Sequence, residues 1–239
     1  MLFRSVSKIS LGLIAVLLTA GPAAALPGGV GARLKEGLAR GATSMVEGAS
    51  TSGYKGFFIF CANYPEQCTG DGKAATVELD EQKARDLVEV NTEVNTRVVP
   101  DNRGNDFDHW QLYANFGHCN EYAIQKRKAL IDRGWPIGAL ALSVVHTSYD
   151  KGNLLHLVLS VRTDKGDLVL DNLRPLVLPW NRTGYGWVMR QSASDPLRWV
   201  LLGEDVDPWL KARGREVPAE AVAAKAPNAP PEPGPSDAG

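Results

Sequence analysis

The 239-residue sequence lacks several features that would assign it to a large class of proteins. Its formal net charge is only -1 and no stripe of lysine and arginine runs along it, which argues against a nucleic-acid-binding protein. It has no internal repeat. Beyond its first 25 residues it has no apolar run near the length of about 20 residues that a membrane-spanning helix needs. The mature chain is therefore expected to be soluble.

The first 25 residues have the three parts of a secretory signal peptide. Arg4 and Lys8 form a positive flank, residues 11–20 form a short apolar run, and residues 23–25 are three alanines of the kind that a signal peptidase reads. Such a segment directs export, and cleavage after Ala25 would leave a mature chain that begins at Leu26, so we predict a periplasmic or secreted bacterial protein. An uncleaved membrane anchor is the alternative, but the apolar run is short for that purpose.

What remains is expected to form one domain with loosely structured ends. Residues 26–56 are rich in Gly, Ala and Ser and are predicted to be flexible. Residues 213–239 are rich in Ala and Pro and are predicted to be a disordered tail, because they cannot bury enough apolar surface. The segment between them, residues 57–212, is long enough for one domain with a sizeable core and too short for two.

Cysteine is scarce, with three residues in the whole chain. Cys61 and Cys68 flank a turn-like Tyr-Pro-Glu run, and thiols in close range tend to pair in the oxidising compartments that exported proteins enter. We therefore predict a disulfide between them, which leaves Cys119 unpaired. An odd cysteine in an exported protein is either a partner for another chain or a reactive thiol, and a buried inert cysteine is the remaining alternative.

The order of the predicted elements, helices first and then an antiparallel sheet, indicates an α+β domain. Asp80 can cap a helix over residues 80–98 that carries one apolar stripe. A second helix is predicted over residues 119–133, ended by Gly134. Residues 163–166, Thr-Asp-Lys-Gly, favour a hairpin turn. Strands are expected over residues 140–147, 155–162, 168–171 and 186–190.

Cys119 stands at the predicted start of a helix, where unpaired N–H groups and the helix dipole stabilise a thiolate. A cysteine nucleophile also needs a base. Of the four histidines, His156 is the one for which the sequence predicts an acidic partner. The strand that begins with His156 is joined by the predicted hairpin to a strand that ends at Asp171. A loop of two or four residues makes the two side chains diagonal neighbours on one face, whereas a three-residue loop with a bulge breaks this parity. A structural histidine and a turn aspartate remain the alternative.

Four short motifs surround these residues. They are Gly-His-Cys-Asn-Glu-Tyr-Ala around Cys119, Gly-Trp-Pro from Gly134, His-Leu-Val-Leu from His156 and Val-Leu-Asp-Asn-Leu around Asp171. In order and spacing they resemble the bacterial transglutaminase-like cysteine peptidases, and the resemblance extends over residues 58–199. It implies a papain-like core, in which the helix that carries the nucleophile packs on an antiparallel sheet that carries the histidine and the aspartate.

The resemblance also implies a function and partners. The family includes periplasmic proteases that cut large surface adhesins and so release biofilms, and some members are held inactive by an inner-membrane receptor. In the adhesin-cleaving members, acidic residues beside the nucleophile help to bind a calcium ion needed for activity. Here His118 and Asn120 replace two of them and Glu121 is the remaining carboxylate, so calcium, which the resemblance would allow, is not expected and no metal ligand is assigned.

The expected reaction is acyl transfer through a thioester. His156 takes the proton of Cys119, the thiolate attacks a peptide carbonyl, and Asp171 fixes the tautomer of the imidazole. The oxyanion would be held by the backbone N–H of Cys119 and by a second donor. The candidates for this donor and for shaping the site are Trp110, Gln111 and Asn172.

Two other functions remain open from the sequence. An amidase or transglutaminase would use the same three residues with a different acceptor, since loop shape chooses the acceptor. A catalytically inactive module would use the groove only to bind a protein, and the altered neighbours of Cys119 are compatible with that.

Overall fold

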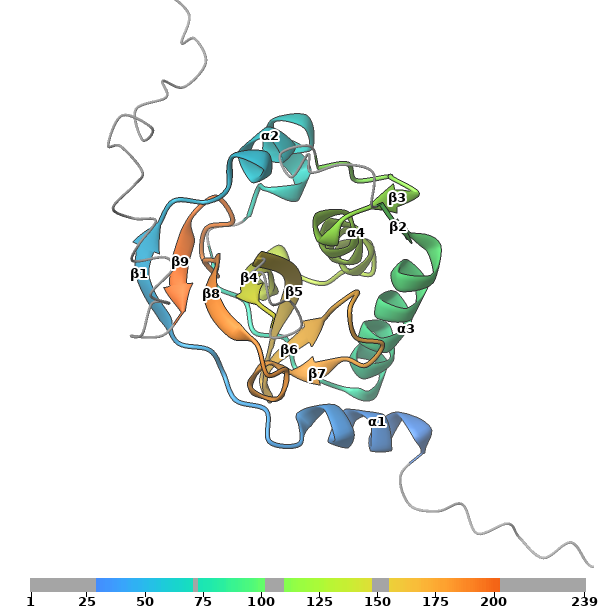
Figure 1. Ribbon diagram of the computed structural model, residues 1–239. Helices are drawn as coiled ribbons and strands as arrows, with labels where there is room; N and C mark the ends of the chain where they lie inside the picture. Colours follow the sequence, from blue (N-terminus) through green and yellow to red (C-terminus); the bar gives the residue numbers. More distant parts are fainter. Residues whose placement is uncertain (1–28, 71–72, 102–109, 148–154, 203–239) are drawn as a thin grey trace, which may run out of the picture.

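The structure is a computed structural model of the chain (Figure 1). The predicted signal peptide, residues 1–25, and the predicted tail, residues 213–239, lie outside the residues that it describes. None of the helices in the described residues combines the length and the apolar character that crossing a membrane requires. The described residues are 29–70, 73–101, 110–147 and 155–202.

A seven-stranded sheet forms the centre of the domain. Its strands are β1 (Glu47–Thr51), β4 (Leu140–His146), β5 (Leu155–Thr163), β6 (Gly166–Leu170), β7 (Leu178–Pro179), β8 (Gly186–Gln191) and β9 (Trp199–Leu202). Their order is β1-β9-β8-β4-β5-β6-β7, and every neighbouring pair is antiparallel. Nearly all residues of β4, β5 and β6 are buried. Helix α4 packs against β4 and β5, and Tyr185, Trp180 and Trp187 pack against Val145, Val158 and Val169 of the three strands.

Four α-helices and several short elements complete the described part of the chain. They are α1 (Val30–Ala39), α2 (Lys55–Asn63), η1 (Pro65–Gln67), α3 (Glu81–Arg97), β2 (Val99–Pro100), β3 (Phe116–Gly117), α4 (Cys119–Asp132), η2 (Ile137–Ala139) and η3 (Trp180–Arg182). The curved sheet wraps one side of α4, and α3 lies beside α4 (Figure 1). Asp80 caps α3 as predicted, because its carboxylate accepts a hydrogen bond from the N–H of Lys83 at 2.6 Å.

The hairpin between β5 and β6 has the two-residue loop that the sequence offered as one alternative. Thr163 pairs with Gly166 across this loop. Gly166 has a φ of +121°, and a Cβ at this position would lie 2.6 Å from the backbone nitrogen of Thr43. Only glycine fits both the conformation and the close approach, which fixes the loop length and with it the pairing of the two strands.

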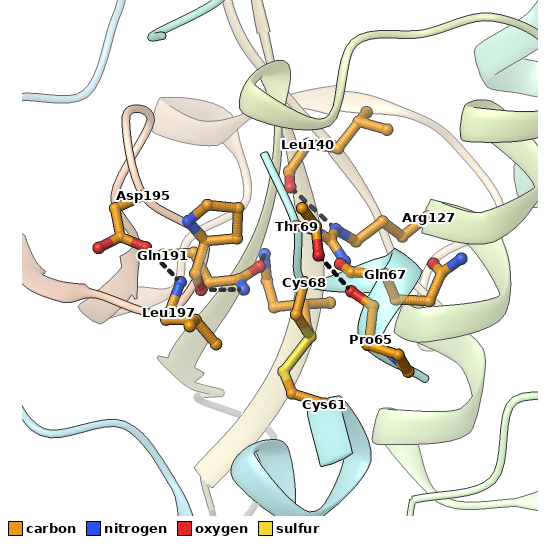
Figure 2. Close-up of a disulfide and its surroundings, with 12 residues drawn as sticks. Cys61, Pro65, Gln67, Cys68, Thr69, Arg127, Leu140, Gln191, Asp195 and Leu197 are labelled. Carbon is orange, nitrogen blue, oxygen red and sulfur yellow. Dashed lines mark hydrogen bonds between the residues drawn. A yellow bond between two sulfur atoms is a disulfide. The ribbon is translucent and has the colours of Figure 1, made fainter. Parts of the chain in front are cut away.

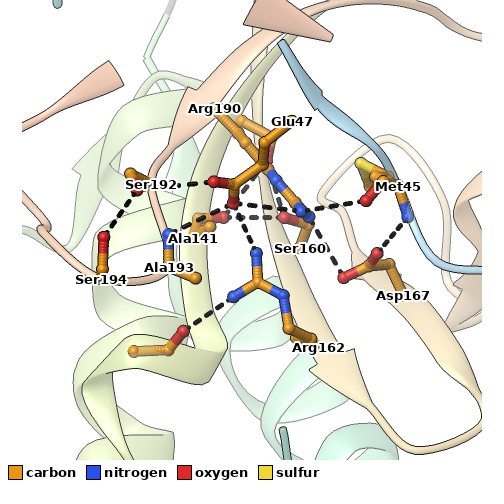
Figure 3. A network of polar contacts seen from close by, with 12 residues as sticks. Met45, Glu47, Ala141, Ser160, Arg162, Asp167, Arg190, Ser192, Ala193 and Ser194 are labelled. Carbon is orange, nitrogen blue, oxygen red and sulfur yellow. Dashed lines mark hydrogen bonds and ion pairs between the residues drawn. The ribbon is translucent and has the colours of Figure 1, made fainter. Parts of the chain in front are cut away.

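The structure differs from the flexible segment predicted over residues 26–56. Within the described part of that range, α1 forms a helix, and β1 pairs with β9 at one edge of the sheet. The carboxylate of Glu47 holds β1 in place by ion pairs with Arg162 at 2.8 Å and Arg190 at 3.3 Å (Figure 3). β1 is an edge strand that is held by hydrogen bonds to β9 and by the ion pairs of Glu47. Such a strand does not need alternating apolar residues, so its sequence does not show the alternation that predicts a strand.

The predicted disulfide joins Cys61 of α2 to Cys68. It closes the loop that contains η1, and the carbonyl of Gln67 in this loop accepts a hydrogen bond from Nη1 of Arg127 (Figure 2). Nε of the same arginine donates to the carbonyl of Leu140 at 3.1 Å. Because Arg127 is a buried residue of α4, the disulfide loop, α4 and the start of β4 are tied together at one side chain.

We expect the double replacement Cys61→Ser and Cys68→Ser to lower the free energy of unfolding by about 2–3 kcal/mol, the value for closing a loop of this length. The measurement is urea unfolding of the oxidised protein and of the double variant. Cys119→Ser is the matched control, because this thiol is outside the disulfide. Equal unfolding midpoints for the double variant and the unmodified protein would contradict the expectation.

Candidate active site

Cys119 is the first residue of α4 and carries the one thiol outside the disulfide. It is partly exposed, and its Sγ lies 3.6 Å from Oδ1 of Asn120. At this position the thiol adjoins the backbone N–H groups that the first helical turn leaves without helical partners. It also adjoins the positive end of the helix dipole. Both favour a negative charge on sulfur.

Glu121, at the third position of α4, fixes the start of this helix. Its Oε2 accepts a hydrogen bond from the N–H of His118 at 2.8 Å, and its Oε1 accepts one from the N–H of Gln111 at 3.2 Å. Burial raises the pKa of this carboxyl above its ordinary value, against the lowering effect of these hydrogen bonds. A Cβ at Gly117 would lie 2.4 Å from the Cβ of Glu121, so the sequence needs glycine there.

His156 and Asp171 meet across the hairpin. Leu159 of β5 pairs with Leu170 of β6, and the same register makes Asp171, directly after β6, a diagonal neighbour of His156. Nε2 of His156 lies 2.7 Å from Oδ1 of Asp171, and Cys119 is near enough to raise the pKa of the same imidazole. The structure therefore brings the three predicted residues together, with one imidazole between a thiol and a carboxylate.

The charges in this group support one another. Burial alone would lower the pKa of His156, but its hydrogen bonds and charge interactions with Asp171 and Cys119 prevail and raise the pKa to about 9. Burial alone would raise the pKa of Asp171, but the bonds from His156, Tyr185 and the N–H of Leu173 hold that pKa below its ordinary value. At neutral pH the imidazole is therefore protonated beside an ionised carboxylate, the state that stabilises a thiolate.

Asp171 is held by α3 as well as by the hairpin. Nδ2 of Asn95 donates to the carbonyl of Asp171 at 2.9 Å, and Oδ1 of Asn91 accepts the N–H of Asp171 at 3.1 Å. These two asparagines are one helical turn apart, so one face of α3 fixes the backbone on both sides of the carboxylate. Both residues lie in the helix predicted over residues 80–98, but their contact with Asp171 depends on how α3 packs.

A fourth partner, Tyr185, was not predicted from the sequence. Its hydroxyl donates to Oδ2 of Asp171, and Nε of Arg174 donates to the same hydroxyl at 3.2 Å. The guanidinium of Arg174 also lies 5.0 Å from the centre of the Tyr185 ring. A tyrosine between two glycines reads as part of a turn, and only the fold places it against the carboxylate.

Tyr185→Phe is expected to lower kcat/KM by about tenfold, because it removes a hydrogen bond to a charged group, which is worth about 1.5–3 kcal/mol. The same hydrogen bond also stabilises the resting enzyme, so only part of its free energy is lost in the transition state. The loss of kcat/KM should therefore stay well below the loss caused by removing Asp171 itself. The measurement is steady-state cleavage of a peptide. Tyr64→Phe, on a ring that packs against Phe60, is the matched control and should leave kcat/KM unchanged.

The residues predicted to hold the oxyanion or shape the site lie around α4 and the hairpin. Trp110 is buried and packs against Phe57 and Phe60, with ring centres 6.0 and 6.2 Å away. The side chain of Gln111 is exposed. Asn172 follows Asp171 and is partly buried. The oxyanion and site-shaping roles of these three residues stay predictions.

A cavity of about 160 Å³ lies beside the start of α4. Both carboxylate oxygens of Glu121 there already accept backbone N–H groups, and Oδ1 of the buried Asn120 is directed at the thiol. Across the described ranges, no three His, Cys, Asp or Glu side chains are placed to hold a metal ion. These residues do not fit calcium, which takes about six to eight oxygen ligands. The cavity is lined by Asp101, Gln111, Ala114, Phe116, Gly117, His118 and Glu121.

Comparison with known proteins identifies the family. The family described as bacterial transglutaminase-like cysteine proteinase BTLCP matches residues 47–207, which is more than half of the chain. The chain belongs to this family. It is therefore a cysteine peptidase, and the predicted α+β fold with a transglutaminase-like core is confirmed. No curated protein matches the chain in a separate search.

Solved structures of Legionella pneumophila LapG are similar to this member of the family. The calcium-bound form is 24% identical, with 55% of this chain and 79% of that chain covered and a TM-score of 0.42. A second LapG structure is 20% identical, with 80% and 98% covered and a TM-score of 0.42. An EGTA-treated form is 20% identical, with 80% and 99% covered and a TM-score of 0.41.

Proposed function

We propose that this cysteine peptidase cuts an exported protein by acyl transfer, with Cys119 as nucleophile, His156 as base and Asp171 as the group that orients the imidazole. The observation that carries the proposal is the position of His156, whose Nε2 bonds to Asp171 and whose pKa is raised by the neighbouring Cys119 as well as by Asp171. A cysteine nucleophile needs a base of this kind and a base needs an orienting partner.

The proposed steps use these three side chains and the start of α4. Nε2 of His156 faces Asp171, so Nδ1 is the nitrogen available to the thiol. The Cys119 thiolate attacks the peptide carbonyl, and its backbone N–H stabilises the oxyanion. The imidazolium of His156 then protonates the leaving amine, which frees the new N-terminus and leaves a thioester. Neutral His156 activates water, and hydrolysis of the thioester restores the thiol.

We further propose that the substrate is a bacterial surface adhesin, that the peptidase acts in the periplasm, and that an inner-membrane receptor regulates it. Family membership supports a protein substrate. The disulfide between Cys61 and Cys68 supports an oxidising compartment, because such bonds persist mainly outside the cytosol. The signal-like leader, which lies outside the described residues, supports export.

The first experiment measures the rate of Cys119 alkylation by iodoacetamide as a function of pH, in the unmodified protein and in His156→Ala. The proposal expects rapid alkylation of the unmodified protein at neutral pH and a displaced pH profile in the variant, because the imidazolium stabilises the thiolate. Slow alkylation that His156→Ala leaves unchanged would overturn the proposed pair.

A second measurement identifies the reaction by its products. A surface adhesin is incubated with the peptidase and the fragments are analysed by mass spectrometry. New N-termini that are absent with Cys119→Ala support peptide-bond cleavage. Isopeptide cross-links or deamidated side chains without new N-termini would instead indicate the transglutaminase or amidase reaction.

We expect cleavage to be independent of calcium. Addition of EGTA should change kcat/KM by less than about twofold, since His118, Asn120 and Glu121 do not offer the several free oxygen ligands that calcium requires. The measurement compares cleavage with EGTA, with added calcium, and after replacement of calcium in the EGTA sample. A loss of activity in EGTA that calcium restores would contradict the fit of the residues around α4.

A further inference from the structure

Lys126 is a buried lysine on the face of α4 that begins with Cys119. The two residues are seven positions apart, which is about two helical turns, so their side chains leave the helix on the same side. Lys126 is only 1% exposed. Its Nζ has no hydrogen-bond partner among the described residues.

The surroundings of Lys126 place it beside the proposed triad. Its Nζ lies 5.8 Å from the centre of the Tyr122 ring, and the hydroxyl of Tyr122 reaches the carbonyl of Val98 at the end of α3 at 2.6 Å. One turn earlier on α3, Asn95 bonds to the carbonyl of Asp171. The lysine is therefore packed where α4 meets α3, and the charge of Asp171 acts on it.

Other charged groups on the packed elements are engaged elsewhere. Glu89 and Glu93 of α3 form ion pairs with Arg133, as does Asp86. The next lysine of α4, Lys128, bonds to the exposed Asp132. On β5, His156 bonds to Asp171, so the carboxylate of Asp171 interacts with both cations. The titratable groups that face Lys126 are thus Asp171, the His156 bonded to it, and Tyr122.

A lysine in this position is costly for the fold. Burial lowers the pKa of Lys126 to about 7, and the charge of Asp171 only partly opposes this effect. A buried charge without a bonded counter-ion destabilises a protein, and an apolar side chain of similar volume is usually neutral or stabilising in its place. Packing alone would therefore favour methionine at position 126, which suggests that the charge serves the site.

We propose that Lys126 is a positioning residue for the proposed catalytic group: its ammonium acts on Asp171 and sets the pH range in which the Cys119 thiolate and the His156 imidazolium coexist. This inference rests on the proposed function. Lys126 touches no reacting atom. Below pH 7 Lys126 is charged, and a positive charge favours loss of a proton from nearby groups, so removing it should shift thiolate formation to higher pH. Near pH 9, where His156 loses its proton, Lys126 is already neutral, so imidazolium deprotonation should stay in place.

The test measures iodoacetamide alkylation of Cys119 against pH in Lys126→Met, which keeps the length of the side chain and removes its charge. The acid limb of the profile, where the thiolate forms, is expected to move to higher pH by about half a unit to one unit, and the alkaline limb to stay in place. Lys128→Met is the matched control, because it removes the same charge from a partly exposed position on the same helix, and its profile should coincide with that of the unmodified protein. An unshifted acid limb in Lys126→Met would overturn the inference.

Thermal unfolding gives a second readout. Lys126→Met should melt at a higher temperature than the unmodified protein, and the gain should be largest below pH 7. It should shrink between about pH 7 and pH 10, because there the unfolded chain still holds the Lys126 proton that the folded chain has lost, so the unmodified protein regains stability. A lower melting temperature for Lys126→Met throughout would show that the ammonium is needed for packing, and would overturn the inference.

The two proposals can fail separately. If His156→Ala leaves the alkylation profile unchanged, the Cys119–His156 pair fails and the inference falls with it. If His156→Ala changes the profile and Lys126→Met does not, the pair stands and the role of Lys126 alone is overturned.

Discussion

Cys119→Ala is expected to reduce peptide cleavage to the background of the assay, and His156→Ala to reduce kcat by at least about 10⁴-fold, because the thiolate and its proton acceptor act as one unit. Asp171→Asn should cost less, about 10²–10⁴-fold. The amide keeps the shape of the group, but it loses the charge that stabilises the imidazolium. The measurement is steady-state cleavage of one peptide by all three variants.

The control for Asp171→Asn is Asp164→Asn at the tip of the same hairpin. Asp164 pairs with the exposed Lys165 and should leave kcat unchanged. Each variant is first shown to melt cooperatively. An active Cys119→Ala protein would contradict the assignment of the nucleophile. An Asp171→Asn protein with full activity would reduce Asp171 to a structural residue.

The same variants carry a pH prediction. Activity of the unmodified protein should fall at alkaline pH as His156 loses its proton near pH 9. The raised pKa also links His156 to stability. Its contribution is complete below pH 6.5, the ordinary value, and is lost as the pH rises through about 9, since the folded protein then no longer holds an extra proton. The difference in stability between the unmodified protein and His156→Ala should therefore shrink over this range.

The sequence could predict those parts of the site that depend on local geometry. The start of α4 at Cys119 follows from a helix-forming run after a glycine, and the disulfide follows from two cysteines around a turn. The contact of His156 with Asp171 needed one more fact, the loop length, because a single added residue reverses the faces of a strand. The close approach of Gly166 to Thr43 fixes this loop length, but that contact exists only in the folded chain.

The missed parts of the site depend on packing between elements that are far apart in the sequence. Tyr185 reaches Asp171 because β7 and η3 return the chain beside the hairpin. Lys126 and Lys128 are both basic residues of α4, yet Lys126 is buried, whereas Lys128 is partly exposed. The 3.6-residue period of apolar residues cannot predict which of these two lysines is buried, because α4 is covered on most of its circumference and has no single solvent face.

The arrangement makes α4 the common support of the site. Near its start it presents the thiol, while Glu121 fixes the first turn. Near its middle, Arg127 ties it to the disulfide loop and to β4, and the charge of Asp171 acts on the buried Lys126. A displacement of the helix would therefore move the nucleophile and the surroundings of the carboxylate together. This coupling explains why polar side chains are buried along a helix that lies within the core.

The largest effect on stability is expected from Asp167→Ala. Asp167 is fully buried, and its Oδ1 lies 3.2 Å from Nη1 of the buried Arg190 (Figure 3). Its Oδ2 accepts the N–H of Met45 at 2.6 Å. Removal of Asp167 leaves the buried guanidinium with the partly exposed Glu47 as its remaining carboxylate, and breaking a buried pair in this way costs about 3–5 kcal/mol. Urea unfolding measures the loss.

Two companion variants decide whether the pair itself is responsible. Asp132→Ala removes an equivalent carboxylate from the exposed pair with Lys128 and should cost less than about 1 kcal/mol. Asp167→Leu combined with Arg190→Met removes both charges, so no charge is left buried and unpaired. The double variant should be more stable than Asp167→Ala, even though it differs more from the natural sequence. If it is less stable instead, the network joining β1, β6 and β8 depends on its hydrogen bonds to Met45 more than on the balance of charge.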